Sequence, residues 1–129
     1  MPTQRASTIR YRQQLYVEVC ELVEVEYGDD LQLDGIASRI ASSRRQLQRA
    51  FAEIGGTTFR EHLSQVRMSQ AAELLTSTSL TIREVSHRVG YRQPAQFAKA
   101  FRRHLGSAPS EYRAKVAQIG VPEPALQAA

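Results

Sequence analysis

Two short stretches of the sequence concentrate side chains that can hydrogen-bond to a nucleic acid. Arginine, lysine and glutamine are the residue types that most often bind phosphate oxygens and the edges of guanine and adenine. The same types also keep the outer face of a helix in water, so one such stretch alone favours neither interpretation. The residues concerned are Arg44, Arg45, Gln48 and Arg49 in the first stretch and Gln96, Lys99, Arg102 and Arg103 in the second.

An internal repeat relates the two stretches. The repeated unit is a short helix, a turn of about four residues and a longer helix with a basic polar face, which is the pattern of a helix-turn-helix. Two such units in register favour nucleic-acid binding over a merely solvated surface. The matched pairs are Ile36 with Val85, Arg39 with Arg88, Ile40 with Val89 and Ala41 with Gly90, and then, after one extra residue in the second turn, Leu47 with Phe97, Arg49 with Lys99, Ala50 with Ala100, Phe51 with Phe101 and Gly56 with Gly106.

Apolar residues recur at helical spacing along the whole chain, so we expect an all-α fold of about seven helices without strands. Serine or threonine followed three residues later by glutamine or glutamate marks three helix starts, at Ser43, Thr58 and Thr81. The expected helices cover about 13–27, 36–40, 43–55, 59–76, 82–89 and 94–105, with a short turn from Pro109.

The composition argues against several classes of protein. The chain of 129 residues has no apolar run near the ~20 residues that cross a bilayer, and its polar start lacks a secretion signal, so we expect a cytoplasmic protein without membrane contact. Cys20 alone forms no internal disulfide, and His62, His87 and His104 are too far apart for a compact metal motif. No set of nucleophile, base and acid is recognisable, so we expect no enzyme activity, cofactor or metal.

The charge is unevenly distributed along the chain. Residues 1–32 carry three basic and six acidic side chains, whereas residues 33–113 carry thirteen basic and six acidic ones. A basic central region after an acidic leading segment is typical of a surface that binds a polyanion.

These patterns resemble the DNA-binding domain of the AraC/XylS family of bacterial transcription regulators over roughly residues 13–113. The second unit is the more diagnostic, because its glycine, aromatic and Pro-Ser-Glu-Tyr-Arg positions recur in order with the spacing of the family. The residues that carry the resemblance are Ile36-Ala37 and Ser43 to Phe51 in the first unit, and Ile82 to Val89, Gly90-Tyr91, Phe97, Phe101-Arg102-Arg103, Gly106 and Pro109-Ser110-Glu111-Tyr112-Arg113 in the second.

The resemblance implies two helix-turn-helix subdomains joined by a long helix. A helix of ~18 residues is ~27 Å long, comparable with the ~34 Å turn of DNA, so two recognition helices of one monomer can enter successive major grooves. We expect a flexible N-terminus at 1–12, a first subdomain at 13–57, a linker helix at 58–77, a second subdomain at 78–113 and a flexible tail at 114–129.

The resemblance also implies partners. It predicts a sequence-specific regulator that binds double-stranded DNA as a monomer and activates transcription by contacting RNA polymerase, although a repressor would have the same recognition helices. This chain shows no small-molecule effector site. Its length fits either a small single-domain regulator of the MarA and SoxS type or a fragment of a larger member.

By position in the family's recognition helices, Arg45, Gln48 and Arg49 are expected to read bases, and Arg44 to lie nearer phosphate. Pro94 and Ala95 occupy base-contact positions of the second unit but cannot donate side-chain hydrogen bonds, so that unit is expected to read thymine methyl groups and DNA shape with weaker specificity. The DNA-binding residues expected in the second unit are Arg92, Gln93, Ala95, Gln96, Lys99, Arg102 and Arg103.

The first turn departs from the second at one position. Ala41 stands where the second unit has Gly90. A left-handed alanine costs ~1–2 kcal/mol, so we expect the first turn to be built differently.

Two other functions fit the same residues. A non-specific or architectural nucleic-acid binder would use the basic faces for phosphate without discriminating bases. A helical protein-interaction module would instead dock a basic partner on its acidic first helix.

Overall fold

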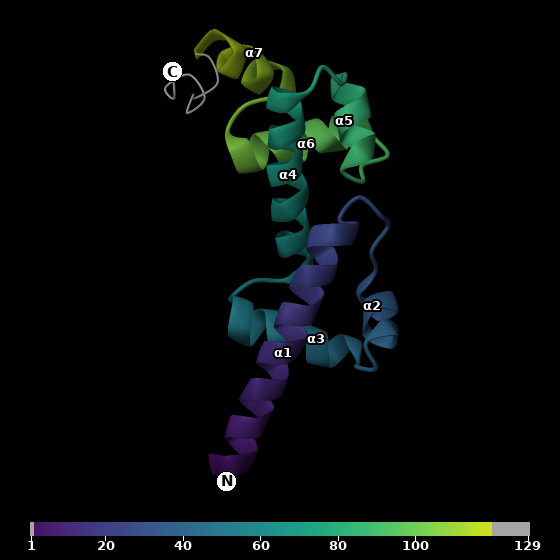
Figure 1. Cartoon of the computed structure of the whole chain (residues 1–129), viewed down its shortest axis with the longest axis vertical. Helices are drawn as coiled ribbons and strands as arrows, with labels where there is room; N and C mark the ends of the chain where they lie inside the picture. The colour runs from purple at the N-terminus through teal and green to yellow at the C-terminus, as the bar shows by residue number, and fades with distance from the viewer. Residues whose placement is uncertain (1, 120–129) are drawn as a thin grey trace, which may run out of the picture. The chain divides into compact units, whose positions relative to one another are not determined.

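The computed structural model describes residues 2–119, and helices make up most of that range (Figure 1). No strand occurs in the described residues, which confirms the expected all-α class. The chain divides into two compact units, Met1–Val66 and Arg67–Ala129, and each contains one helix-turn-helix. The helices are α1 (Pro2–Glu26), α2 (Leu33–Arg39), α3 (Arg44–Ala50), a π-helical turn η1 (Phe51–Gly55), α4 (Phe59–Ser77), α5 (Ile82–Arg88), α6 (Pro94–Leu105) and α7 (Pro109–Ile119).

The core of the first unit is built on α1, which packs against α3 and η1. Leu15, Val19 and Val23 follow one another every fourth residue and are buried. That spacing places them on one side of the helix, where they form a continuous apolar stripe. The stripe fixes the orientation of the helix-turn-helix beside it. The other buried members of this core are Ile36, Ala37, Leu47, Ala50, Phe51, Leu63 and Val66.

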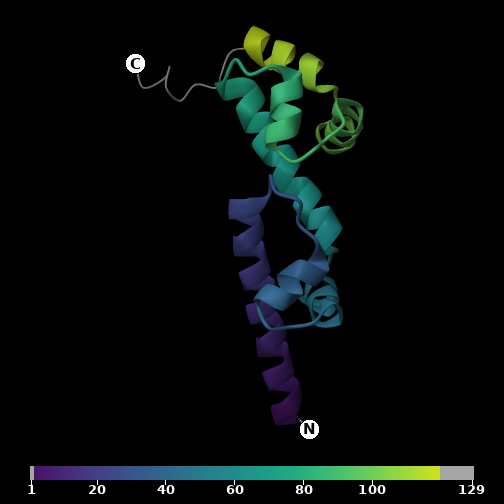
Figure 2. The same cartoon turned by 90° about the vertical axis from the view of Figure 1, so that its right-hand side faces the viewer.

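The second unit is organised around α6, against which α5 and α7 both pack (Figure 2). Phe97 and Phe101 lie one turn apart on α6 and are fully buried. The ring of Tyr91 meets Phe97 edge-on at a centroid distance of 5.8 Å, and Tyr112 meets Phe101 in the same way at 5.3 Å. Edge-on contact is a favoured arrangement of aromatic rings, so these pairs set the rotation of α6 about its axis.

Local side-chain caps begin several helices. Thr81 and Glu84 form a complete capping box, with bonds of 3.0 Å and 2.8 Å between each side chain and the other residue's backbone N–H. Ser43 accepts the backbone N–H of Gln46 at 3.2 Å, and Thr58 accepts the N–H three residues after it at 3.0 Å. The amide oxygen of Gln46 is buried and has no hydrogen-bond partner in the described residues, so the return bond expected for the box at Ser43 is not formed.

Three helix boundaries differ from the sequence-based expectation, and the smallest difference is the start of α2 at Leu33 rather than near Ile36. α1 begins at Pro2, whereas the apolar pattern predicted a flexible segment over 1–12 and a start near Gln13. The side chains of residues 6–11 are exposed, so this segment has no apolar stripe to detect and only continues a helix that is held by its packed part. α7 continues to Ile119, so residues 114–119 of the expected tail are helical. The remainder of that tail, residues 120–129, lies outside the described range.

Both turns contain a left-handed residue at the matching position and the same closing hydrogen bond, so the expectation that the first turn is built differently is wrong. Ala41 has φ +55° and Gly90 has φ +98°, both in the left-handed region. In each turn the N–H of the next residue bonds to the carbonyl five positions back, at 2.8 Å to Ala37 and 2.9 Å to Ser86. This is the hydrogen bond that closes a helix end after a left-handed residue, and it holds alanine in a conformation that glycine adopts without strain.

Candidate nucleic-acid interface

The basic residues of α3 lie on its exposed side. Ser43 caps the helix, while Leu47 and Ala50 are buried in the core of the first unit. Burial of one side of a short helix forces the residues between these positions toward solvent. The four residues predicted on this helix are all exposed: Arg44, Arg45, Gln48 and Arg49.

The same construction recurs in α6. Pro94 takes the first helical position, where its fixed φ and missing N–H cost nothing, and Gly106 ends the helix with φ +88°. Phe97 and Phe101 anchor the buried side. All seven residues predicted in this unit are exposed, on α6 or just before it: Arg92, Gln93, Ala95, Gln96, Lys99, Arg102 and Arg103.

The cations of the two helices differ in their surroundings. Arg45, Arg49 and Lys99 have no hydrogen bond or ion pair to any part of the chain that the structure describes, so a ligand can take all of their donors. Arg44 pairs with Asp34 of α2 at 3.2 Å, and Arg102 pairs with Glu111 of α7 at 3.4 Å. The sequence did not predict that either carboxylate contacts a candidate DNA-binding residue.

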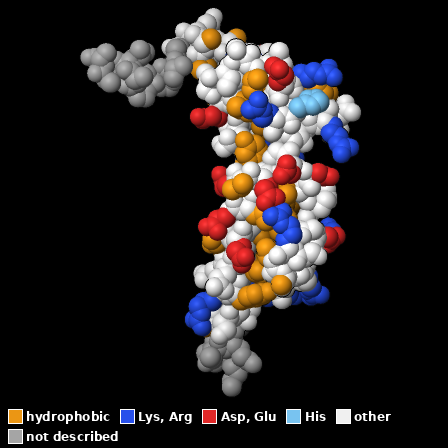
Figure 3. All heavy atoms as spheres, turned by 45° about the vertical axis from the view of Figure 1, so that its right-hand side comes forward, with side chains coloured by type: hydrophobic (Ala, Val, Ile, Leu, Met, Phe, Trp, Pro, Cys, Tyr) orange, Lys and Arg blue, Asp and Glu red, His pale blue; other side chains and the backbone are white. Residues whose placement is uncertain are grey.

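Positive charge does not cover the whole surface. The face drawn in Figure 3 mixes acidic, basic and apolar side chains without a large area of one sign. The exposed acids of α1 include Glu18, Glu21 and Glu24. The exposed basic residues of α3 and α6 are therefore a local feature of a surface that carries both signs of charge.

The titratable groups inside the first unit fit a structural role. Burial raises the pKa of the Cys20 thiol and of the Tyr16 hydroxyl, and the two side chains hydrogen-bond to each other. A thiol with a raised pKa is a poor nucleophile. Burial also lowers the pKa of His62, which favours its neutral form. These groups supply no activated nucleophile, and no group of three potential metal ligands occurs in the described residues.

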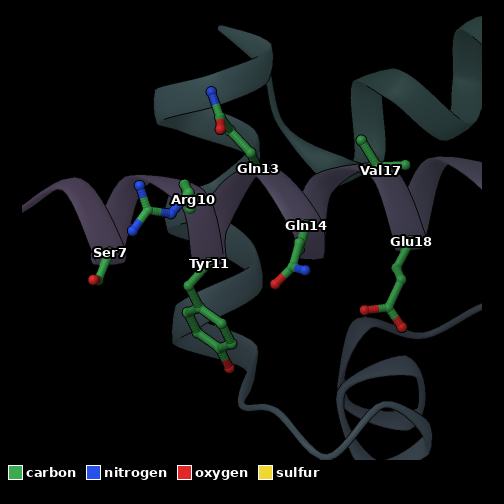
Figure 4. Close-up of a pocket in the computed structure, with 7 residues that line it drawn as sticks. All are labelled: Ser7, Arg10, Tyr11, Gln13, Gln14, Val17 and Glu18. Atoms are coloured by element: carbon green, nitrogen blue, oxygen red, sulfur yellow. The ribbon is translucent and has the colours of Figure 1, made fainter.

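A groove on α1 offers no enclosed binding site. Figure 4 shows its lining side chains spread along one face and the flanks of that single helix. All of them are exposed, so the groove lacks the buried polar group that would orient a ligand. The lining residues are Ser7, Arg10, Tyr11, Gln13, Gln14, Val17 and Glu18. Over the described part of the chain, we also find no helix whose length and hydropathy would suit a bilayer crossing.

Comparison with known proteins links this arrangement to transcription. A helix-turn-helix domain model matches residues 36–115. The Msm operon regulatory protein of Streptococcus mutans is 31% identical over 99 residues, which cover 77% of this chain and 36% of that protein. The lactose operon transcription activator of Staphylococcus xylosus is 31% identical over 93 residues, covering 72% of this chain and 33% of that protein. The chain thus spans about a third of the length of these curated relatives.

Solved structures share the fold. An AraC-type regulator from Chromobacterium violaceum superposes with a TM-score of 0.77 at 32% identity, over 84% of this chain and 96% of that one. The DNA-binding domain of the global transcriptional factor AdpA, crystallised with a target DNA, gives a TM-score of 0.78 at 30% identity, over 84% and 97%. The fold seen here is therefore one that binds DNA in a close structural relative.

Proposed function

Because the chain belongs to the AraC family of helix-turn-helix transcription regulators, we propose that it binds specific sequences of duplex DNA and regulates transcription. The matched construction of α3 and α6 carries this proposal. Each helix buries an apolar side and exposes arginine, lysine or glutamine on the opposite side. The AdpA domain, which has the same fold, was solved with its target DNA, and this supports the extension to the present chain.

In the first unit, α3 is the base-reading helix. Arg45, Gln48 and Arg49 project from its solvent side, and their donors make no hydrogen bond within the described residues. This suits them to guanine and adenine edges in a major groove. Arg44 stands at the first position of the helix and contacts phosphate.

In the second unit, the start of α6 makes apolar contacts. Pro94 and Ala95 suit thymine methyl groups, while Gln96 and Lys99 provide the polar contacts to bases. The sugar-phosphate backbone is contacted by the other basic residues predicted in this unit and by the side-chain amide of the residue before α6. The basic residues are Arg92, Arg102 and Arg103, and the amide is that of Gln93.

We further propose that one monomer uses both helices in successive major grooves and activates transcription through RNA polymerase in the cytoplasm. The name of the Staphylococcus xylosus relative, a transcription activator, favours activation over repression. The long helix α4, of 19 residues, provides a length of about 28 Å, comparable with one turn of DNA.

Selection from a random duplex library tests the proposal without a known operator. The 129-residue chain is mixed with random duplexes of about 25 base pairs at moderate salt, and the bound pool is sequenced. We expect an enriched motif with two elements about one helical turn apart. A parallel selection with an Arg45→Ala, Arg49→Ala double variant is expected to lose one element and keep the other.

Other outcomes assign other functions. A motif with a single element would mean that α6 mainly holds phosphate. Binding without any enrichment would overturn sequence-specific recognition and favour an architectural DNA-binding protein. Absence of binding even at about 100 mM salt would favour a protein-interaction module.

A further inference from the structure

Each recognition helix carries one arginine that is already held by a carboxylate of a neighbouring helix. In the first unit, Arg44 donates from Nη1 to Oδ2 of Asp34 at 3.2 Å. In the second unit, Arg102 donates from Nη2 to Oε1 of Glu111 at 3.4 Å. The four side chains are between 58% and 72% exposed, so solvent and an anionic ligand can both reach the two ion pairs.

These pairs are weak enough for DNA to displace. Each pair has one hydrogen bond and lies at the protein surface, where water screens the charges. An exposed ion pair of this kind changes an equilibrium constant for folding or binding by no more than about fivefold. The pair between Arg39 and Glu26 differs, because it has two bonds of 2.7 Å and lies outside the recognition helices. Arg44 and Arg102 can therefore exchange their carboxylates for phosphate, whereas Arg39 has a better intramolecular partner.

The cost of the exchange has two parts. Binding must first break the ion pair, and the carboxylate then remains beside the DNA as a charge of the same sign as the phosphates. Neither part depends on the base sequence, because phosphate contacts carry no sequence information. Arg45, Arg49 and Lys99 have no carboxylate partner in the part of the chain that the structure describes, so neither cost applies to them.

We propose that Asp34 and Glu111 lower the affinity of this chain for every DNA sequence by competing with phosphate for Arg44 and Arg102. This inference rests on the proposed DNA-binding function. It adds two acidic residues, from α2 and α7, to an interface that the sequence places only on α3, on α6 and in the turn before α6. They set how tightly the chain holds DNA, while the base-reading residues set which sequence it prefers.

The test measures dissociation constants of the full chain for its selected duplex and for a random duplex at one fixed salt concentration. Asp34→Asn is expected to tighten binding to both duplexes about two- to fivefold, leaving their ratio unchanged. Glu111→Gln is expected to act in the same direction, and its amide oxygen can still accept the backbone N–H of Ala108, which Glu111 binds at 3.0 Å. Thermal unfolding checks that both variants stay folded.

Glu21→Gln is the matched control. Glu21 is exposed on α1 and pairs with neither recognition helix, so this variant makes the same change in net charge at a distance from the proposed contact. It is expected to leave both dissociation constants within about 1.5-fold of wild type. In an Arg44→Gln background, Asp34→Asn is expected to lose its effect, because the competition has no arginine to act on.

The possible failures are distinguishable. Equal tightening by Glu21→Gln and Asp34→Asn would reduce the effect to net charge and overturn the inference, as would weaker or unchanged binding by Asp34→Asn. If the wild-type chain bound neither duplex, the proposed function itself would fail, and this inference with it.

Discussion

Arg113 of α7 donates from Nε to the backbone carbonyl of Leu75 at 3.0 Å, and from Nη2 to the carbonyl of Thr78 at 3.4 Å. The last four carbonyls of a helix have no partner within it, and Leu75 supplies one of these at the end of α4. A cation at this end also interacts favourably with the helix dipole. Arg113 thus joins α7, which braces α6, to the end of α4 within the second unit.

Loss of this contact should destabilise the chain. Arg113→Met keeps most of the side-chain volume but removes both hydrogen bonds, so the free energy of unfolding is expected to fall by about 1–2 kcal/mol. Urea denaturation followed by helical circular dichroism measures the change. Lys115→Met is the control, because Lys115 is exposed on the same helix without a hydrogen bond in the described residues. Equal stability of the two variants would contradict a role for the Arg113 contact.

Ala41→Gly should stabilise the first unit. The left-handed backbone of Ala41, with φ +55°, costs an alanine about 1–2 kcal/mol, and glycine avoids that strain at a smaller cost in chain entropy. The side chain is exposed, so no packing is lost. We expect a net gain of about 0.5–1 kcal/mol in the free energy of unfolding.

The reverse change in the second unit serves as its counterpart. Gly90→Ala imposes the same strain at φ +98°, and the new Cβ would lie 2.8 Å from the guanidinium of Arg67. The expected loss is about 1–2 kcal/mol. A stable Gly90→Ala variant together with an unstable Ala41→Gly variant would show that the two turns are not equivalent in energy.

Local chemistry made much of the fold predictable from sequence. The capping box at Thr81, the helix start at Pro94 and the stop at Gly106 all depend on residues within one turn of the position they determine. Each signal reflects a backbone donor, acceptor or φ value that only a few residue types satisfy. These two helix starts and this helix end therefore lie in the structure where the sequence predicted them.

Features that depend on distant parts of the chain were not predictable in this way. Ala41 looked incompatible with a left-handed turn, yet the hydrogen bonds of the turn and the packing of the helices beside it determine its conformation. The pairing of Arg44 with Asp34 arises only when α2 and α3 fold together, and no local spacing rule indicates it. The polar start of α1 carries no apolar stripe, so periodicity cannot reveal it.

Ser86→Ala should also stabilise the protein. Ser86 is fully buried on α5, and its hydroxyl has no hydrogen-bond partner among the residues that the structure describes. Its counterpart in the first unit is Ala37, which is buried at the same place in the repeat. Removing an unsatisfied buried hydroxyl relieves its desolvation cost, so we expect a gain of about 1 kcal/mol in the free energy of unfolding. Ala37→Ser should show the opposite sign, and a loss of stability in Ser86→Ala would point to a hydrogen bond formed through water.

His62 should make the stability of the first unit depend on pH. Its ring lies 5.6 Å from the ring of Phe51 and 6.4 Å from that of Tyr16. Its Nε2 is buried and has no hydrogen-bond partner within the described part of the chain. Burial lowers the pKa of His62, while the charge of Glu24 opposes this in part. Below about pH 6.5, the pKa of a histidine in the unfolded chain, the unfolded chain therefore binds more protons than the folded chain. The free energy of unfolding then decreases as the pH is lowered, until the pH passes the pKa of His62 in the folded chain.

The measurement compares His62→Phe with wild type. Urea denaturation at about pH 7.5 and about pH 5.5 gives the loss of stability for each, and the wild type is expected to lose more. The difference between the two proteins isolates His62 from His87 and His104, which both retain. A parallel decline in the two proteins would show that His62 titrates as an ordinary histidine.

Arg49→Ala should separate base reading from phosphate binding on α3. Arg49 is exposed, unpaired within the described residues, and placed one turn after Arg45 on the solvent side of the recognition helix. If its guanidinium reads a guanine, its removal weakens binding to the selected duplex by about 1–3 kcal/mol and barely changes binding to a random duplex. Arg10→Ala removes the same charge from α1 and should weaken neither complex appreciably. Equal losses of affinity for the selected and the random duplex would assign Arg49 to phosphate instead, because a phosphate contact contributes to every sequence alike. In that case the variant would also release about one counterion fewer on binding either duplex, which would make the affinity less dependent on salt.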